Sequence, residues 1–460
     1  MESLGATSRS VLYPTPGVTE LSAAASGPGR AHFFQDNREF AVIGTTFYEI
    51  SQFGVLTSRG TVAIGSNPAT ISSNGDGGGQ LFITSGDNGY SYDLTTNTLS
   101  QVAALNGKAT MGDHLDGYFL ALDAATSKLY ISALLDGTSW TTGTDFAQRS
   151  IAPDPWVSMK VNARYIWLLG EQTLEVWYNT GATFPFAPHP SGLVPYGIAA
   201  PFSAVTLNGV LTWLGADRGG DAYVLRAAGF TPEVVSDYPL QRILNGYSKI
   251  DDAVADAYSD EGQTFYLLTF PNENVTWSLS VQSGKWSERA TWISEENKYT
   301  AWRPRWHAMA FGEHRMLDSE TGSVYRMTNS LTSDVGGRVI RRMRRAPTLS
   351  AENARVFYSA FEVDLEPGLG TATGQGSDPQ VMLRISNDGG KTWGAELLRS
   401  AGKMGEYTKR VIWHRLGAGR RRVFEVSVSD PIPWRLTAAY LTFGQSPNGR
   451  PSPRQAQSGA

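Results

Sequence analysis

The stretch QTFYLLTFPNENVTWSLS, residues 263–280, shows the pattern on which the fold prediction rests. Apolar and polar residues alternate over Val275–Ser280, Phe265–Leu268 are a short apolar and aromatic run, and Asn272 and Asn274 separate the two. Alternation with a period of two predicts a half-buried strand, and a short loop between two such runs predicts antiparallel neighbours. The tight turn Gln282-Ser283-Gly284-Lys285 follows directly. These residues therefore predict a β-meander.

Similar alternating runs recur between residues 32 and 327. They are Arg38–Ile50, Gln80–Tyr92, Tyr118–Ile131, Arg164–Tyr178, Gly209–Leu225 and Trp306–Met327. Their starts lie roughly 30–60 residues apart, a spacing typical of propeller blades. We predict an all-β chain with an N-terminal arm over residues 1–30 and a β-propeller-like domain of six or seven meander blades over residues 31–335. A stack of unrelated sandwiches is the alternative.

One segment of the predicted propeller has a helical pattern instead. Ser236 or Asp237 can cap a helix, and Pro239 suits its first turn. Ile250, Val254 and Ala257 continue the helical spacing beyond Gly246. We predict a helical insertion of two short helices at about residues 236–260. It either contacts a partner ring or connects two blades.

The chain after residue 335 predicts a second β domain. Its strand runs are Arg355–Leu365, Gln380–Ser386, Thr408–Trp413, Arg422–Ser429 and Trp434–Phe443. Long glycine-rich loops between such strands favour an antiparallel β-sandwich, which we place at residues 336–445. Residues 446–460 contain three prolines and otherwise polar or small residues, and we predict a flexible tail.

Composition excludes several classes of protein. The 460 residues include no cysteine, which excludes a disulfide framework, thiolate metal sites and thiol nucleophiles. The 49 glycines and the 13 Trp, 19 Tyr and 19 Phe residues favour β structure with many turns. Residues 1–13 lack the pattern of a secretory signal, and no stretch approaches the roughly 20 apolar residues of a membrane helix. We therefore expect no membrane anchor.

The net charge of −4 hides an asymmetry along the chain. Residues 1–337 hold 20 Lys/Arg and 33 Asp/Glu, whereas residues 338–460 hold 19 Lys/Arg and 10 Asp/Glu. The change falls at Gly336-Gly337, a candidate hinge. Two domains of opposite charge, net −13 and net +9, are the simplest interpretation.

Five arginines follow this point within eight residues: Arg338, Arg341, Arg342, Arg344 and Arg345. The flanking glycines and Pro347 favour an extended or irregular linker over a helix. Docking on an acidic protein surface, between rings or between subunits, is the preferred interpretation. A solvated face and a DNA contact are the alternatives.

Residues 386–393 read SNDGGKTW and fit the S-x-D-x-G-x-T-W pattern known as an Asp-box. In such a hairpin turn, the Ser and Asp side chains bond backbone groups, the glycines take positive φ and the Trp packs beneath. We interpret Ser386, Asp388, Gly390, Thr392 and Trp393 as a structural turn without catalytic chemistry.

No sequence pattern indicates a catalytic, cofactor-binding or metal site. The histidines at 32, 114, 189, 307, 314 and 414 are scattered, and the nearest pair, His307 and His314, is seven residues apart across a predicted turn. Tryptophans are dense at positions 277, 286, 292, 302 and 306. They fit blade packing, a subunit interface or sugar stacking. We expect no enzyme activity.

Several C-terminal segments, together with the Asp-box, resemble one protein family. They are GKMGEY (402–407), RVIW (410–413), RLG (415–417), RVFEV (422–426) and SDP (429–431). GEQTLEVWY (170–178), Gly181-Ala182 and PTPG (14–17) are similar to the same family. It is the packaged-DNA stabilisation protein of short-tailed bacteriophages, also called the tail hub or nozzle protein.

The resemblance implies a structural protein of the virion tail, made in the host cytoplasm, with no cofactor. It implies a hexameric ring below the portal and adaptor rings that extends the DNA channel and helps keep the genome inside. The partners implied are further copies of the chain, adaptor or head-to-tail ring proteins, tail needle, fibre or spike proteins, and passing DNA without sequence specificity. An acidic channel wall would let DNA slide, and a basic domain would grip an acidic neighbour. A glycan-binding or receptor-binding propeller and a propeller glycosidase are the alternatives.

Overall fold

The computed structural model describes residues 11–22, 26–75, 77–148, 153–217, 219–352 and 354–445. One compact unit comprises Glu20–Thr291 and Lys298–Arg326, and the other comprises Met1–Thr19, Trp292–Asn297 and Met327–Ala460. Both are built almost entirely from β-strands, which confirms the predicted fold class. Among the described residues, no helix has the length and apolar character needed to cross a bilayer. The flexible tail predicted for residues 446–460 lies outside the described residues.

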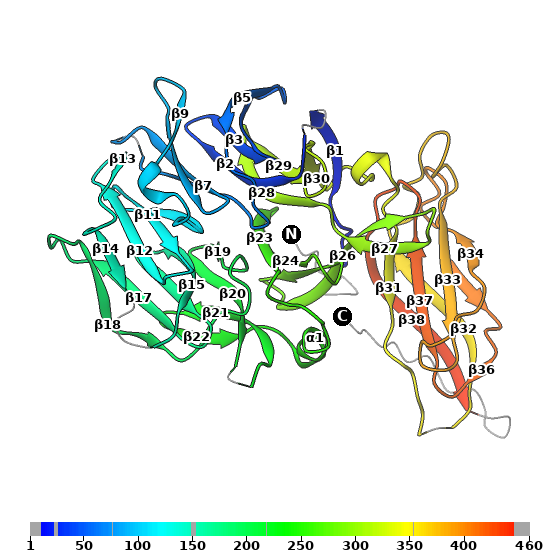
Figure 1. The fold of residues 1–460 in the computed structure, drawn as a ribbon. Helices are drawn as coiled ribbons and strands as arrows, with labels where there is room; N and C mark the ends of the chain where they lie inside the picture. The colour runs from blue at the N-terminus through cyan, green and yellow to red at the C-terminus, as the bar shows by residue number, and fades with distance from the viewer. Residues whose placement is uncertain are drawn as a thin grey trace. The chain divides into compact units, whose positions relative to one another are not determined.

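The described part of the propeller contains seven antiparallel sheets, or blades (Figure 1). Blade 1 contains β2 (Gly29–Gln35), β3 (Arg38–Ile43), β4 (Thr46–Ile50) and β5 (Leu56–Thr61). Blade 2 contains β6 (Thr70–Ser73), β7 (Gln80–Ser85), β8 (Asn88–Asp93) and β9 (Thr98–Gln101). Blade 3 contains β10 (Met111–Leu115), β11 (Tyr118–Asp123), β12 (Lys128–Ala133), β13 (Asp136–Trp140) and β14 (Phe146–Gln148).

The remaining blades follow the same meander order. Blade 4 contains β15 (Trp156–Asn162), β16 (Tyr165–Gly170), β17 (Leu174–Asn179) and β18 (Phe186–Val194). Blade 5 contains β19 (Val205–Leu207), β20 (Val210–Ala216), β21 (Ala222–Ala228) and β22 (Thr231–Val234). Blade 6 contains β23 (Val254–Asp260), β24 (Gln263–Phe270), β25 (Val275–Ser280), β26 (Lys285–Ile293) and β27 (Lys298–Ala301). Blade 7 contains β28 (Pro304–Ala310), β29 (Glu313–Asp318), β30 (Val324–Thr328) and β1 (Gly17–Ser22).

Strand β1 closes the propeller. It lies within the stretch predicted as an N-terminal arm, yet it is hydrogen-bonded to β30 at the outer edge of blade 7. A strand from the start of the chain thus completes the last blade, and closure of the ring hides the sheet edges that an open stack would expose. The structure therefore contains a propeller and not the alternative stack of sandwiches.

Polar side chains on the first strand of one blade bond the backbone of the next blade. Thr70 on β6 accepts a hydrogen bond from the Gly112 amide of β10 at 2.9 Å. Asp113 on β10 accepts one from the Val161 amide of β15, also at 2.9 Å. These bonds satisfy backbone donors that face the inside of the ring, where no strand of their own sheet reaches them.

Apolar cores fill the spaces between adjacent blades. Between blades 1 and 2, Phe40 and Phe47 stack with ring centres 5.6 Å apart, and Tyr92 contacts both edge-on. Between blades 4 and 5, Trp167 and Trp213 pack with centres 6.4 Å apart. Aromatic residues, which are abundant in the composition, therefore pack adjacent blades against each other.

The helical insertion is shorter than predicted. Helix α1 (Tyr238–Leu244) begins after Asp237, whose carboxylate accepts the Leu240 amide at 2.9 Å. The second predicted helix is wrong, because Val254–Asp260 forms the first strand of blade 6, with Ala255 and Tyr258 buried. Apolar spacing over such a short segment fits both the 3.6-residue period of a helix and the two-residue period of a strand. The segment forms a strand because it pairs with β24.

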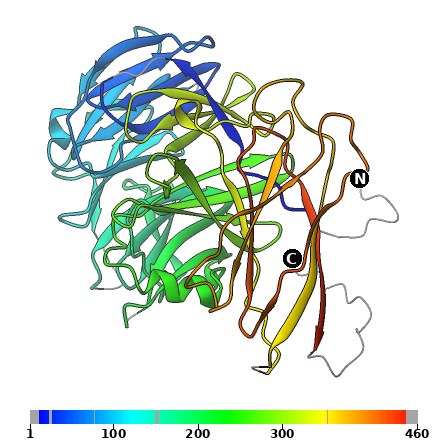
Figure 2. The same cartoon turned by 90° about the vertical axis from the view of Figure 1, so that its right-hand side faces the viewer.

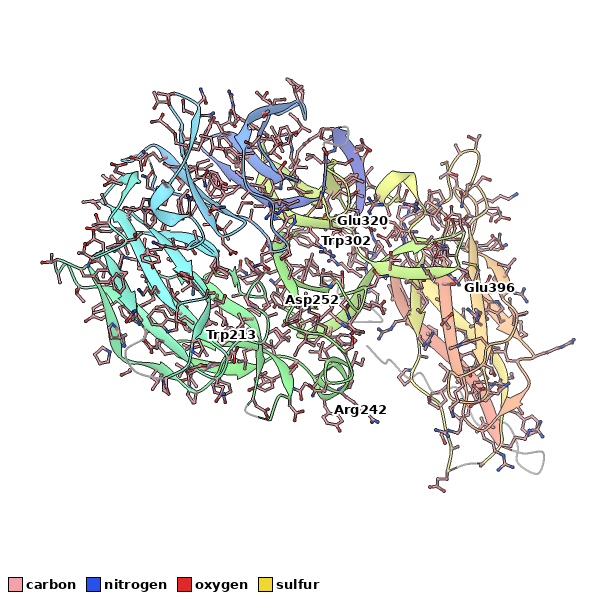
Figure 3. The ribbon with its side chains drawn as sticks, in the orientation of Figure 1. Trp213, Arg242, Asp252, Trp302, Glu320 and Glu396 are labelled. Atoms are coloured by element: carbon pink, nitrogen blue, oxygen red, sulfur yellow. The ribbon has the colours of Figure 1, made fainter. Side chains whose placement is uncertain are left out.

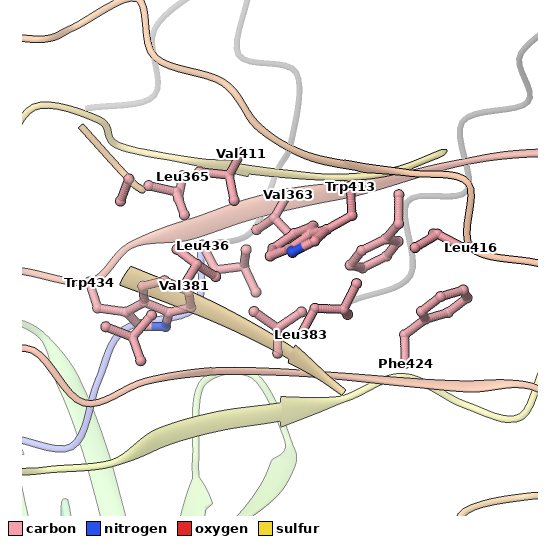
Figure 4. Close-up of a cluster of buried hydrophobic side chains, with 14 of the residues drawn as sticks. Val363, Leu365, Val381, Leu383, Val411, Trp413, Leu416, Phe424, Trp434 and Leu436 are labelled. Carbon is pink, nitrogen blue, oxygen red and sulfur yellow. The ribbon is translucent and has the colours of Figure 1, made fainter. Parts of the chain in front are cut away.

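The sandwich consists of two four-stranded sheets in the described residues, shown from two directions in Figures 1 and 2. One sheet has the order β31 (Arg342–Arg345), β37 (Val423–Val428), β33 (Gln380–Ser386) and β34 (Leu397–Ser400). The other contains β35 (Val411–His414), β32 (Val356–Leu365), β36 (Ala418–Gly419) and β38 (Leu436–Gln445). Short 3₁₀ turns occur at η1 (Ala103–Leu105) and η2 (Val335–Gly337). The sandwich core holds Phe361 and Phe424, stacked at 4.7 Å, with Trp413 and Trp434 (Figure 4).

Candidate interaction surface

The arginine run lies on and just before β31, an edge strand of the sandwich. It is not the linker that the flanking glycines and proline suggested, because Arg342 pairs with Val428 and Arg345 pairs with Glu425, both on β37. The two glycines before it do adopt positive φ, at 68° for Gly336 and 72° for Gly337. The turn therefore ends at Gly337, and the arginines belong to the sandwich fold.

Two of these arginines are held by contacts within their own unit. Arg342 is 7% exposed and donates to the Asp430 carbonyl oxygen at 2.9 Å, and burial lowers its pKa to about 10. Arg341 donates to the Glu396 carboxylate at 3.1 Å, and its guanidinium lies 4.7 Å from the centre of the Trp292 ring. Both side chains thus stabilise the fold of this unit.

Arg345 takes part in a charge and ring cluster on the same sheet. It binds the Glu425 carboxylate at 2.7 Å and lies 4.8 Å from the Trp393 ring centre. Arg384 lies 3.6 Å from the other oxygen of Glu425 and 5.4 Å from the same ring. Two cations therefore share one nearly buried carboxylate and one indole face.

The predicted turn residues come together on the loop that follows β33. The Asp388 carboxylate accepts the Lys391 and Thr392 amides at 2.9 and 3.0 Å, and the Ser386 hydroxyl accepts the Gly390 amide at 2.8 Å. Hydrogen bonds from Ser386 and Thr392 hold the pKa of Asp388 well below its usual range. All of these bonds are local, so the geometry supports a structural role and assigns no chemistry to the turn.

Arg344 differs from its neighbours in the run. Its side chain is exposed and makes no hydrogen bond or ion pair with the part of the chain that the structure describes. Arg338 is half-buried just before β31. The docking role of the run stays a prediction, and Arg344 is the member whose charge is most accessible to a partner.

Sequence reasoning missed a buried polar network that joins blades 1 and 7. Glu39 binds Arg315, and the His32 ring contacts the same carboxylate at 2.8 Å through Nε2. The Nδ1 of His32 lies 2.7 Å from the Trp306 carbonyl oxygen on β28. The side chains of all three charged or titratable residues have no solvent exposure. Since these residues are up to 276 positions apart, no local motif signals their contact.

The histidine pair noted in the sequence does meet. Nε2 of His307 lies 2.9 Å from Nδ1 of His314 across the β28–β29 hairpin, and burial lowers the pKa of His307 to about 3. Burial also raises the pKa of Asp256 to about 6, although its carboxylate accepts the His307 amide at 2.7 Å. The spacing across a two-residue turn was the available signal for this pair. No cluster of three or more potential metal ligands occurs in the described residues.

The dense tryptophans pack within the chain. Trp302 is 1% exposed, and the indole of Trp277 donates to the Tyr247 hydroxyl at 2.9 Å. The indoles of Trp286 and Trp306 donate to the carbonyls of Val235 and Gly29. These contacts favour the packing interpretation over sugar stacking.

The fold defines the class of the protein as a two-domain all-β chain, a closed β-propeller followed by a β-sandwich. Family models match this chain twice: bacteriophage P22 Gp10, beta-propeller, over residues 2–332, and bacteriophage P22 Gp10, beta-sandwich, over residues 341–444. The chain belongs to the bacteriophage P22 Gp10 family and is a structural protein of the phage tail that stabilises packaged DNA.

Several solved structures resemble the chain at low identity. The N-terminal domain of Nup159 is 12% identical, with a TM-score of 0.42, covering 70% of this chain and 96% of that domain. YCF48 from Cyanidioschyzon merolae is 11% identical, with a TM-score of 0.42, covering 68% and 98%. The Pan2 WD40 domain of Neurospora crassa is 10% identical, with a TM-score of 0.41, covering 68% and 96%. No curated protein matches the sequence.

Proposed function

We propose that the chain forms a hexameric ring below the portal and adaptor, extends the DNA channel, and carries distal tail parts. The observation that carries the proposal is the pair of family matches, which together account for both the propeller and the sandwich. In this role the chain acts by shape and charge, without catalysis or a cofactor. Its partners are further copies of itself, neighbouring ring proteins, needle, fibre or spike proteins, and DNA.

The charge distribution supports a passage for DNA. Residues 1–337 carry a net charge of −13, and DNA carries about one negative charge per 1.7 Å of its axis. An acidic wall would repel phosphates and let the genome slide during ejection. The net charge of +9 over residues 338–460 suits a contact with an acidic neighbour.

Imaging of the isolated protein together with native mass measurement tests the ring. We expect six copies around a central hole, alone or with the adaptor ring. A chain that remains a monomer with the adaptor present, and that binds a glycan, would contradict the proposal and support the receptor-binding alternative.

A further inference from the structure

Helix α1 and the strand before it carry exposed apolar side chains. Tyr238 is 75% exposed and Ile243 is 41% exposed on the helix, and Val234 on β22 is 51% exposed beside it. Leu240 and Leu244 point inward and anchor the helix in the core of blades 5 and 6. Exposed apolar side chains grouped in this way mark an interaction site.

Acidic side chains outnumber basic ones on helix α1 and on the loops next to it. In the described residues the acidic ones are Asp217, Asp221, Asp237, Asp251, Asp252 and Glu273, and the basic ones are Arg242 and Lys249; Figure 3 labels Arg242 and Asp252. Hydrogen bonds join these loops to the end of the helix and to the segment after it: the Ala222 amide donates to the Asn245 side chain at 2.6 Å, and the Asn272 amide donates to Asp252 at 2.9 Å. We call these residues, with Val234, Tyr238 and Ile243, the α1 surface.

The sandwich carries a surface of opposite charge on the segment from β34 to β35. Its exposed apolar side chains are Leu397, Leu398, Met404 and Tyr407, with exposed fractions of 41, 51, 60 and 70%. Its exposed basic side chains are Arg399, Lys403, Lys409 and Arg410, of which Arg410 binds the Glu362 carboxylate at 2.6 Å, and Glu406 is an exposed acid on the same segment. Arg399 donates to the Ile412 carbonyl at 3.0 Å, and the Trp413 indole donates to the Leu397 carbonyl at 2.8 Å, so the segment is held against β35. We call it the β34 surface.

We propose that the α1 surface of one copy binds the β34 surface of a second copy. Each surface carries exposed apolar side chains, and acidic groups predominate on the α1 surface whereas basic groups predominate on the β34 surface, so the two are complementary in net charge. The net acidic charge of the α1 surface would repel a nucleic acid, so a protein occupant fits it better. The exposed apolar side chains of the β34 surface also favour a protein over DNA.

Such a contact has a consequence for symmetry. The two surfaces differ, so each copy uses one to bind the copy before it and the other to bind the copy after it. A head-to-tail contact of this kind generates a closed ring when its rotation closes. The inference rests on the proposed ring and specifies which residues hold it together.

Charge reversal on each surface tests the contact. Asp221 and Asp251 on one surface and Lys403 and Lys409 on the other are exposed and lie outside the buried cores, so their substitution leaves the fold intact. Three variants are needed: D221K/D251K, K403E/K409E, and the chain that carries all four changes. K285E/K391E changes two other exposed lysines and serves as the matched control. Circular dichroism checks that each variant is folded.

Self-association is measured by sedimentation at low and high salt. We expect each two-residue reversal to weaken association at least about tenfold, the chain with four changes to regain it, and the control to behave as the wild type. If both reversals form rings as the wild type does, the contact is wrong while the proposed ring stands. If the wild type and its adaptor form no ring at all, the proposed function fails with it.

Discussion

Arg315 on β29 binds Glu39 on β3, and neither side chain is exposed to solvent. The bond joins the last blade of the propeller to the first. Arg315 also donates to the Gln52 carbonyl oxygen at 2.6 Å, beyond the end of β4. Besides the outer strand β1, this buried pair therefore holds the ring closed from within.

The first prediction concerns this pair. Glu39→Gln leaves the buried Arg315 guanidinium without its counter-charge, which typically costs about 3–5 kcal/mol. We expect the free energy of unfolding to fall by that amount in denaturant titration. Glu233→Gln, in the exposed pair with Arg226, is the control and should cost less than about 1 kcal/mol. Equal effects of the two substitutions would show that the buried pair has no special role.

The second prediction concerns pH. The pKa of Asp256 is raised by burial to about 6, against about 3.9 in an unfolded chain. Between these values the folded state binds more protons, so the contribution of this group to stability falls as pH rises. The free energy of unfolding of the wild type minus that of Asp256→Asn should fall by about 2–3 kcal/mol from about pH 3 to about pH 7 and stay constant above that range. A difference that grows over this range would contradict the assignment.

The third prediction separates folding from docking in the arginine run. Arg342→Ser removes a buried side chain and leaves the Asp430 carbonyl without its donor, which should cost about 1–3 kcal/mol of stability. Arg344→Ser should leave the melting temperature unchanged. If the run docks on an acidic ring, Arg344→Ser should weaken adaptor binding in pull-down at low salt. Unchanged binding by this variant would remove the docking role.

The fourth prediction concerns the turn after β33. Asp388→Ala removes the acceptor of the Lys391 and Thr392 amides, so these two amides should exchange faster with solvent, by about tenfold or more. Lys391→Ala keeps the acceptor and is the control. Equal exchange in the two variants would show that the carboxylate does not hold the turn.

The propeller and sandwich were predictable from sequence because strand alternation and turn residues are local signals. Gln263–Phe270 and Val275–Ser280 pair as the stretch around Asn272 predicted. The division of Ser236–Asp260 into helix and strand was not predictable, because its apolar spacing fits the period of a helix and that of a strand. Pairing within blade 6 makes the second part a strand. Many propeller strands are buried on both faces. For these strands the sequence pattern could not show which face contacts which neighbouring blade.

The buried contacts between residues far apart in the chain could not be predicted from the sequence. Nothing near Glu39 indicates that Arg315 is its partner, since ring closure brings them together. For the arginine run, composition showed the charge but not that Arg341, Arg342 and Arg345 are used inside the fold. Arg344 also pairs with β37, so it is the side-chain hydrogen bonds of the other three arginines, and not strand pairing, that separate them from Arg344.

Genome retention tests the central claim most directly. Phage particles are assembled with the gene for this chain inactivated, and the fraction of packaged DNA that resists nuclease is measured with and without the wild-type chain supplied in trans. The account predicts that particles without the chain lose their DNA and that the supplied chain restores protection. Particles that keep their genome fully protected without it would contradict the account.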